Sequence, residues 1–149
     1  MSVHQAAVRW QHNPHPSGPD TYSRNHRVML NGAQPLNVSA SVEFKGDPRC
    51  ADPEQLLVSA VSSCHMLFFL AIAEYQGFKV ESYQDDPKGY LESNDKKGKA
   101  VTRIELSPRI TFGGDKVPDP KAVSRMHATA HNNCFIRNSI TAAVTINQR

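Results

Sequence analysis

Apolar and polar residues alternate through the first third of the chain, a pattern typical of extended strands. A Pro- and Gly-rich stretch at 13–20 interrupts this pattern. Asn31-Gly32 is a strong signal for a two-residue hairpin. We therefore predict a β-meander whose strands cover residues 6–10, 22–30 and 36–44.

The clearest element is a long helix, which we predict over residues 53–76. Asp52 is a good N-cap that forms a capping box with Gln55, and Gly77 supplies a stop signal. Between residues 66 and 73 the segment is apolar on every face, so this helix must be covered all round. The short continuous apolar run favours a buried core helix over a membrane span.

The rest of the chain alternates again and then forms a second helix. Asp119-Pro120 is a helix start, and that helix runs to about Asn133. Pro108 falls inside a strand pattern and predicts an edge position or a bulge. The remaining strands are expected over residues 79–83 and 89–92, which count as one strand with a bulge or turn at 85–87, and over 101–112 and 140–146. The order βββ-α-ββ-α-β predicts one α+β domain over residues 1–149, with two helices against antiparallel sheet.

Composition narrows the class of protein. Apolar residues make up 39% and charged residues 21% of the 149 residues, which excludes a disordered chain and a polytopic membrane protein. The net charge of +3 is small and dispersed, so we expect no nucleic-acid partner. The first 15 residues lack an apolar stretch of signal-peptide length, so we expect a cytoplasmic protein with no membrane partner.

Three cysteines are the candidate reactive groups. An odd count in a chain of this size fits a reducing compartment, where thiols remain free. Cys64 lies in the long helix, Cys134 ends the second helix, and Cys50 lies in the loop before the long helix. Taken alone, each favours an inert packed thiol over a reactive one, because free Cys is among the most buried residue types.

The residues around Cys64 resemble the signature of the OsmC/Ohr family, the osmotically inducible and organic hydroperoxide resistance proteins, and in particular its OsmC-like branch. That signature is a Pro-Glu-x-Leu helix start with a reactive Cys ten residues after the Glu, matched here by Glu54 and Cys64. A His-x-x-Cys motif before the last strand is matched by His131 and Cys134. Many members carry Pro directly after the second Cys, where this chain has Phe135.

The resemblance implies an OsmC-like fold, an intertwined homodimer and a thiol peroxidase of oxidative stress defence. Cys64 would attack an organic hydroperoxide and become a sulfenic acid, and Cys134 would resolve it as a disulfide. An Arg from the meander, Arg24 or the less well aligned Arg27, would lower the pKa of Cys64, held in place by Glu54. No haem, flavin or metal is expected, and the reductant would be an external dithiol such as a dihydrolipoyl group.

The position of Glu54 raises a geometric question. Ten residues of unbroken helix correspond to a rise of about 15 Å, too far for Glu54 to lie beside Cys64 of its own chain. Either the helix breaks near Ser59, or Glu54 and Arg24 reach the Cys64 of a second chain. The second option also explains why the long helix is apolar all round. As an alternative, Glu54 only favours the helix dipole.

Other functions are possible for the same residues. A metal site could use a tetrahedral set drawn from Cys64, His65, His127, His131 and Cys134. The fold could also serve a ligand- or metal-binding protein without turnover, and a Cys/His hydrolase is a third alternative. Apolar side chains near the cysteines favour alkyl or lipid hydroperoxides as substrates, namely Met66, Leu67, Phe68 and Phe135. Cys50 matches no motif and is expected to be a bystander.

Overall fold

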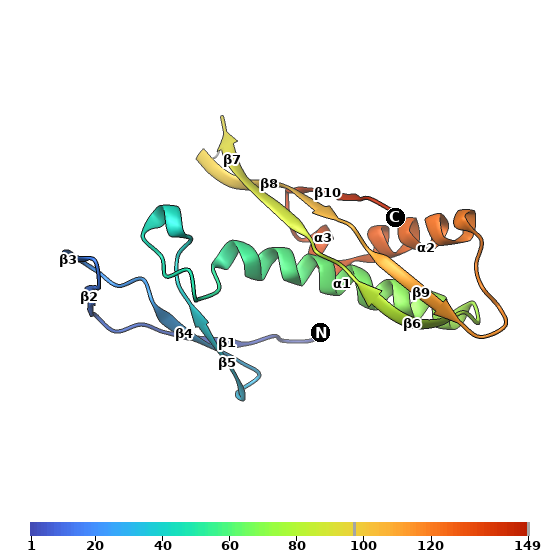
Figure 1. Cartoon of the computed structure of the whole chain (residues 1–149), viewed down its shortest axis with the longest axis horizontal. Helices are drawn as coiled ribbons and strands as arrows, with labels where there is room; N and C mark the ends of the chain where they lie inside the picture. The colour runs from blue at the N-terminus through green and yellow to red at the C-terminus, as the bar shows by residue number, and fades with distance from the viewer. Residues whose placement is uncertain (97, 149) are drawn as a thin grey trace. The chain divides into compact units, whose positions relative to one another are not determined.

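The computed structural model describes residues 1–96 and 98–148, which form two compact units. Met1–Leu56 makes up the first unit and Leu57–Arg149 the second, and each is described by itself. Figure 1 traces the elements along the chain. The α+β class is confirmed, and the assignment of residues 1–149 to a single domain stays a prediction.

The first unit is built on a small antiparallel sheet with β4 between β1 and β5. The hairpin between β4 and β5 is confirmed, because Asn31 and Gly32 both adopt positive φ values of 49° and 67°. The predicted strand over 22–30 is interrupted before β4, and the strand over 36–44 ends early in a 3-10 turn. The elements are β1 (Ala6–Arg9), β2 (Pro14–His15), β3 (Gly18–Tyr22), β4 (His26–Leu30), β5 (Gln34–Val38) and η1 (Val42–Phe44).

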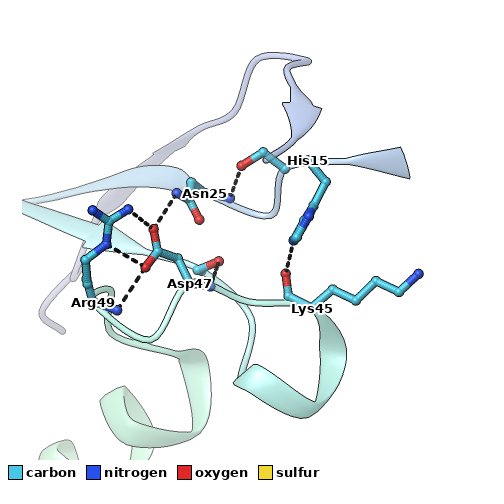
Figure 2. Close-up of polar contacts among 7 residues, drawn as sticks. His15, Asn25, Lys45, Asp47 and Arg49 are labelled. Carbon is cyan, nitrogen blue, oxygen red and sulfur yellow. Dashed lines mark hydrogen bonds and ion pairs between the residues drawn. The ribbon is translucent and has the colours of Figure 1, made fainter. Parts of the chain in front are cut away.

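The loop after η1 is held by Asp47 (Figure 2). Its carboxylate accepts hydrogen bonds from the Arg49 side chain at 2.8 and 3.0 Å and from Asn25 Nδ2 at 3.2 Å. The Arg49 guanidinium holds the pKa of Asp47 well below its usual range. Nearby, His15 Nε2 lies 3.0 Å from the Lys45 carbonyl oxygen. The hydrogen bonds of the Asp47 carboxylate and its ion pair with Arg49 therefore order the segment that leads into the long helix.

Helix α1 (Pro53–Tyr75) begins and ends close to the predicted residues. The capping box is confirmed: the Gln55 N–H donates to Asp52 Oδ1 at 2.8 Å, and the Asp52 N–H donates to Gln55 Oε1 at 3.1 Å. Gly77 follows the helix with φ of 77°. The helix is continuous past Ser59, so the break considered from the sequence is absent. Helix α1 is long and apolar enough to cross a membrane. The core helices of soluble proteins meet the same criteria of length and composition.

Within this chain α1 is buried on one face only. Its buried residues follow helical spacing and are Val58, Val61, His65, Phe69 and Ala73. On the opposite face, Leu67 keeps 59% of its surface exposed, and Tyr75 at the end of the helix keeps 93%. The helix that the sequence predicts to be covered all round therefore has an uncovered apolar face in the single chain.

The second unit contains two antiparallel strand pairs. Residues 79–84 and 88–94 follow one another in one direction, and residues 98–106 and 109–113 return antiparallel to them (Figure 1). The predicted strand over 101–112 is in fact two strands, because Pro108 has no N–H with which to continue a ladder. At this break the Asp85 carboxylate accepts from the Ser107 N–H at 2.7 Å and from Ser62 Oγ at 2.5 Å. The strands are β6 (Lys79–Gln84), β7 (Lys88–Asn94), β8 (Gly98–Leu106) and β9 (Arg109–Gly113).

Two helices and a last strand complete the second unit. Helix α2 (Pro120–Asn133) is capped by Asp119, whose Oδ1 accepts from the Ala122 N–H at 2.7 Å. The short helix α3 (Phe135–Asn138) follows it and was not expected. Strand β10 (Ala143–Ile146) is shorter than predicted and pairs with β8 in parallel, where the sequence indicated antiparallel sheet. The parallel direction follows because α2 and α3 carry the chain back between β9 and β10.

The break at Pro108 divides the core into two clusters. Ile104 and Leu106, before the break, pack with Val58 and Val61 at the beginning of α1. Ile110 and Phe112, after it, pack against a cluster around Phe69. That second cluster also contains Ala73, Met126 and Ala130. The middle of α1, where Cys64 and His65 lie, therefore falls between the two clusters along the helix.

Candidate functional site

The structure brings Cys64 and Cys134 together in the second unit. Both are free thiols, with Cys64 half-buried on α1 and Cys134 only 1% exposed at the end of α2. Burial raises the pKa of the Cys134 thiol, and hydrogen bonding and charge from Cys64 raise it further. The two thiols are therefore close enough to interact directly.

The position of Cys134 is fixed by its backbone surroundings. Its Sγ–H donates to the Val61 carbonyl of α1 at 4.0 Å, which ties it one turn before Cys64. Its Sγ also accepts from the Arg137 N–H at 3.4 Å, so the thiol acts as the N-cap of α3. Phe135 directly follows the capping Cys134 and begins α3. The sequence offered no signal for this cap, because Cys is not a usual capping residue.

A buried pair of histidines lies beside this region. His65 on α1 and His127 on α2 are 1% and 2% exposed, and His65 Nε2 lies 3.0 Å from His127 Nδ1. Burial lowers the pKa of both to about 4, and mutual repulsion of positive charge adds to the shift of His65. Both rings are therefore neutral at pH 7, and the hydrogen bond joins a donor nitrogen to an acceptor nitrogen.

His131 lies about one turn after His127 on α2. Its pKa is lowered by burial and by the positive charge of Arg137. Its Nδ1 is buried without a hydrogen-bond partner among the described residues. From the sequence, His65, His127 and His131 are candidate ligands of a possible metal site, and His131 also matches the His-x-x-Cys motif. Over residues 1–96 and 98–148, no three His, Cys, Asp or Glu side chains are arranged to hold a metal ion.

Arg24 and Glu54 belong to the first unit. Arg24 precedes β4 and Arg27 lies within it, so the two residues do not share one strand. The Arg24 guanidinium donates to Thr21 Oγ1 at 3.0 Å and to the Tyr22 carbonyl, and it lies 4.0 Å from the centre of the Tyr22 ring. Glu54 occupies the first turn of α1 and is half-buried.

The apolar residues predicted beside the cysteines form a partly exposed surface. The rings of Phe68 and Phe135 meet edge to face with centroids 4.9 Å apart. Phe135 keeps 71% of its surface exposed and Leu67 keeps 59%. Such exposed apolar area is available to bind an apolar substrate or a second chain.

The comparisons with known proteins agree with this picture. The family model described as OsmC-like protein matches residues 45–149. An OsmC-like protein of unknown function from Vibrio cholerae is 38% identical over all of both chains, with a TM-score of 0.92. No curated protein matches the sequence.

More distant structures share the fold. The organic hydroperoxide resistance protein OhrB of Bacillus subtilis has a TM-score of 0.71 at 12% identity, covering 99% of this chain and 98% of its own. An organic hydroperoxide resistance protein OsmC from Legionella pneumophila has a TM-score of 0.69 at 18% identity, covering 99% and 96%. With the family model and the Vibrio cholerae relative, these findings show that the chain belongs to the OsmC-like family.

Proposed function

We propose that this protein is a cysteine-based peroxidase that reduces organic hydroperoxides, alkyl or lipid, to alcohols. The observation that carries the proposal is the contact between a half-buried Cys64 and a buried Cys134. An accessible thiol can meet a peroxide, and a shielded thiol beside it can react only with the product of that first step. The names of the structural neighbours in Bacillus subtilis and Legionella pneumophila point the same way.

The chemistry balances with the residues present. The Cys64 thiolate attacks one oxygen of R–O–O–H, the O–O bond breaks, and the alkoxide takes up a proton to leave as R–OH. Cys64 is then a sulfenic acid, and the Cys134 thiol condenses with it to form a disulfide and water. An external dithiol, for example of the dihydrolipoyl type, reduces that disulfide by exchange. None of these steps draws on a bound cofactor.

A turnover assay tests this proposal. Wild type with a dithiol reductant is expected to consume cumene hydroperoxide faster than hydrogen peroxide. Cys64→Ser is expected to abolish consumption, and Cys134→Ser to leave a Cys64 sulfenic acid that dimedone traps. The matched control, Cys50→Ser, should retain activity. Full turnover in Cys64→Ser would refute the proposal, and the absence of turnover in a folded wild type would favour a binding protein.

We further propose that the working unit is a homodimer with two composite sites. Support comes from the uncovered apolar face of α1, on which Leu67 is exposed. It also comes from the continuity of α1, since about 15 Å of helical rise separates Glu54 from the turn that bears Cys64. In this arrangement Glu54 and Arg24 of one chain support the Cys64 of the other chain.

Mixing two inactive variants tests the composite site. Cys64→Ser supplies an intact Glu54, and Glu54→Gln supplies an intact Cys64. If the sites are shared between chains, refolding the two variants together restores activity through mixed dimers. If each site is built from one chain, both sites of a mixed dimer stay defective and activity does not return. Light scattering on the same samples reports whether dimers form.

A further inference from the structure

The Leu57–Arg149 unit has a cavity between β9 and the beginning of α2, and neither Cys64 nor Cys134 lines it. It has a volume of about 400 Å³, within the usual range for small-molecule sites of roughly 300–1,000 Å³. Its walls are mostly apolar and consist of Pro108, Ile110, Phe112, Pro118, Pro120 and Val123. We call it the β9–α2 groove.

The polar groups of the groove are few, and two of them satisfy each other. Ser124 Oγ donates to Gln148 Oε1 at 2.7 Å, and the third polar residue of the lining is His127. His127 is 98% buried, and its Nδ1 is engaged by His65 at 3.0 Å. Among the described residues, its Nε2 has no hydrogen-bond partner. This ring nitrogen of His127 is therefore available to a ligand in a mostly apolar cleft.

The charges around this nitrogen decide what it can bind. Burial keeps His127 neutral at pH 7, so the ring brings no positive charge. The Asp85 carboxylate acts electrostatically on His127, and its negative charge repels an anion. No Lys or Arg is present among the described residues that line the groove. The Asp119 carboxylate already caps the beginning of α2 and offsets the partial positive charge there.

We propose that the β9–α2 groove binds a small apolar molecule carrying one neutral hydrogen-bonding head, of the class of alcohols, with the head on His127 Nε2 and the apolar chain along Ile110, Phe112 and Val123. A neutral hydroxyl can donate to or accept from Nε2, whichever tautomer the pair adopts. A carboxylate of the same chain length would lose its hydration without gaining a cation. This site is separate from the thiol pair and does not depend on peroxidase activity.

The probe is 1-octanol, titrated into the full chain labelled with ¹⁵N-histidine, and octanoate at pH 7 is the charged comparison. The expected result is a saturable change in the His127 imidazole nitrogen signals, transmitted to His65 through their shared hydrogen bond. Octanoate should bind at least tenfold more weakly. Shifts that do not saturate, or equal binding of octanoate, would overturn the proposal.

Variants locate the binding. Ser124→Trp places a large ring at the rim of the groove and should weaken octanol binding at least tenfold. Ala128→Trp, at an exposed position of the same helix outside the groove, is the matched control and should not. His127→Phe keeps the apolar walls and removes the polar head partner, so affinity measured by saturation transfer should fall about fivefold. Equal octanol affinity in wild type and Ser124→Trp would place the molecule elsewhere and refute the groove site.

Discussion

The buried histidine pair makes the stability of this protein depend on pH in a range where few other groups titrate. His65 and His127 have a pKa near 6.5 when unfolded and about 4 when folded. Between these values the unfolded state binds more protons, so the free energy of unfolding falls as the pH falls. The stabilisation is complete above about pH 6.5 and is lost progressively towards pH 4.

The magnitude follows from the two pKa values. Between pH 7 and pH 5 each histidine should remove about 1.8 kcal/mol from the free energy of unfolding. The two share one hydrogen bond and repel each other when charged, so we expect a combined loss of about 2–4 kcal/mol. The lowered pKa values of Asp47 and Glu92 act only below this range.

Urea denaturation at fixed protein concentration, at several pH values from 5 to 7, measures this effect. The double variant His65→Phe/His127→Phe removes both titrating groups and fills the space with apolar rings. This variant should lose most of the dependence of the free energy of unfolding on pH. The part that remains is the contribution of His131. His12→Gln, a change at an exposed histidine, should keep the wild-type slope. If wild type and the double variant change in parallel, the pair is not held neutral by folding and this reasoning is wrong.

Three further predictions concern local structure. A Cβ on Gly46 would lie 1.5 Å from the Ala40 carbonyl oxygen, so Gly46→Ala should lower the free energy of unfolding by about 2 kcal/mol or more in a denaturant titration. Asp119→Ala should cost about 1 kcal/mol in the same assay by removing the cap of α2, and Asp119→Asn should restore most of it. Iodoacetamide should alkylate Cys64 well before the buried Cys134, and mass spectrometry detects this difference. Unfolding in urea should abolish the difference. Early labelling of Cys134 in the folded protein would contradict its burial.

Local signals in the sequence predicted the helices well because the groups that determine their ends are near in sequence. Asp52 and Gln55 cap α1 across three residues, Gly77 ends it, and Asp119 caps α2. The strand break at Pro108 was visible as an irregularity but not as the division between two core clusters. That division depends on which strand faces which part of α1, which is a property of the tertiary structure.

The site was harder to predict from the residues themselves. Cys64 and Cys134 were selected by the family motif, because nothing in their spacing reveals that they meet. The hydrogen bond between His65 and His127 joins positions 62 residues apart, so no local pattern could indicate it. The capping of α3 by Cys134 was likewise hidden, since a thiol is not a recognised cap.

The parallel pairing of β10 with β8 has a consequence for how the protein folds. Strands β7 and β8 are joined by a short connection and can meet early, whereas Ala143 must find Arg103 after about 40 residues of intervening chain. Contacts between distant segments carry a larger entropic cost and form more slowly. Until α2 has folded and brought β10 back, one edge of β8 is open and the side chains of Ile104 and Leu106 lack Val144 and Ile146 as neighbours. An intermediate with this open edge is the species most prone to aggregate, so refolding yield should respond to changes in α2 and β10 more than to changes in the β7–β8 hairpin.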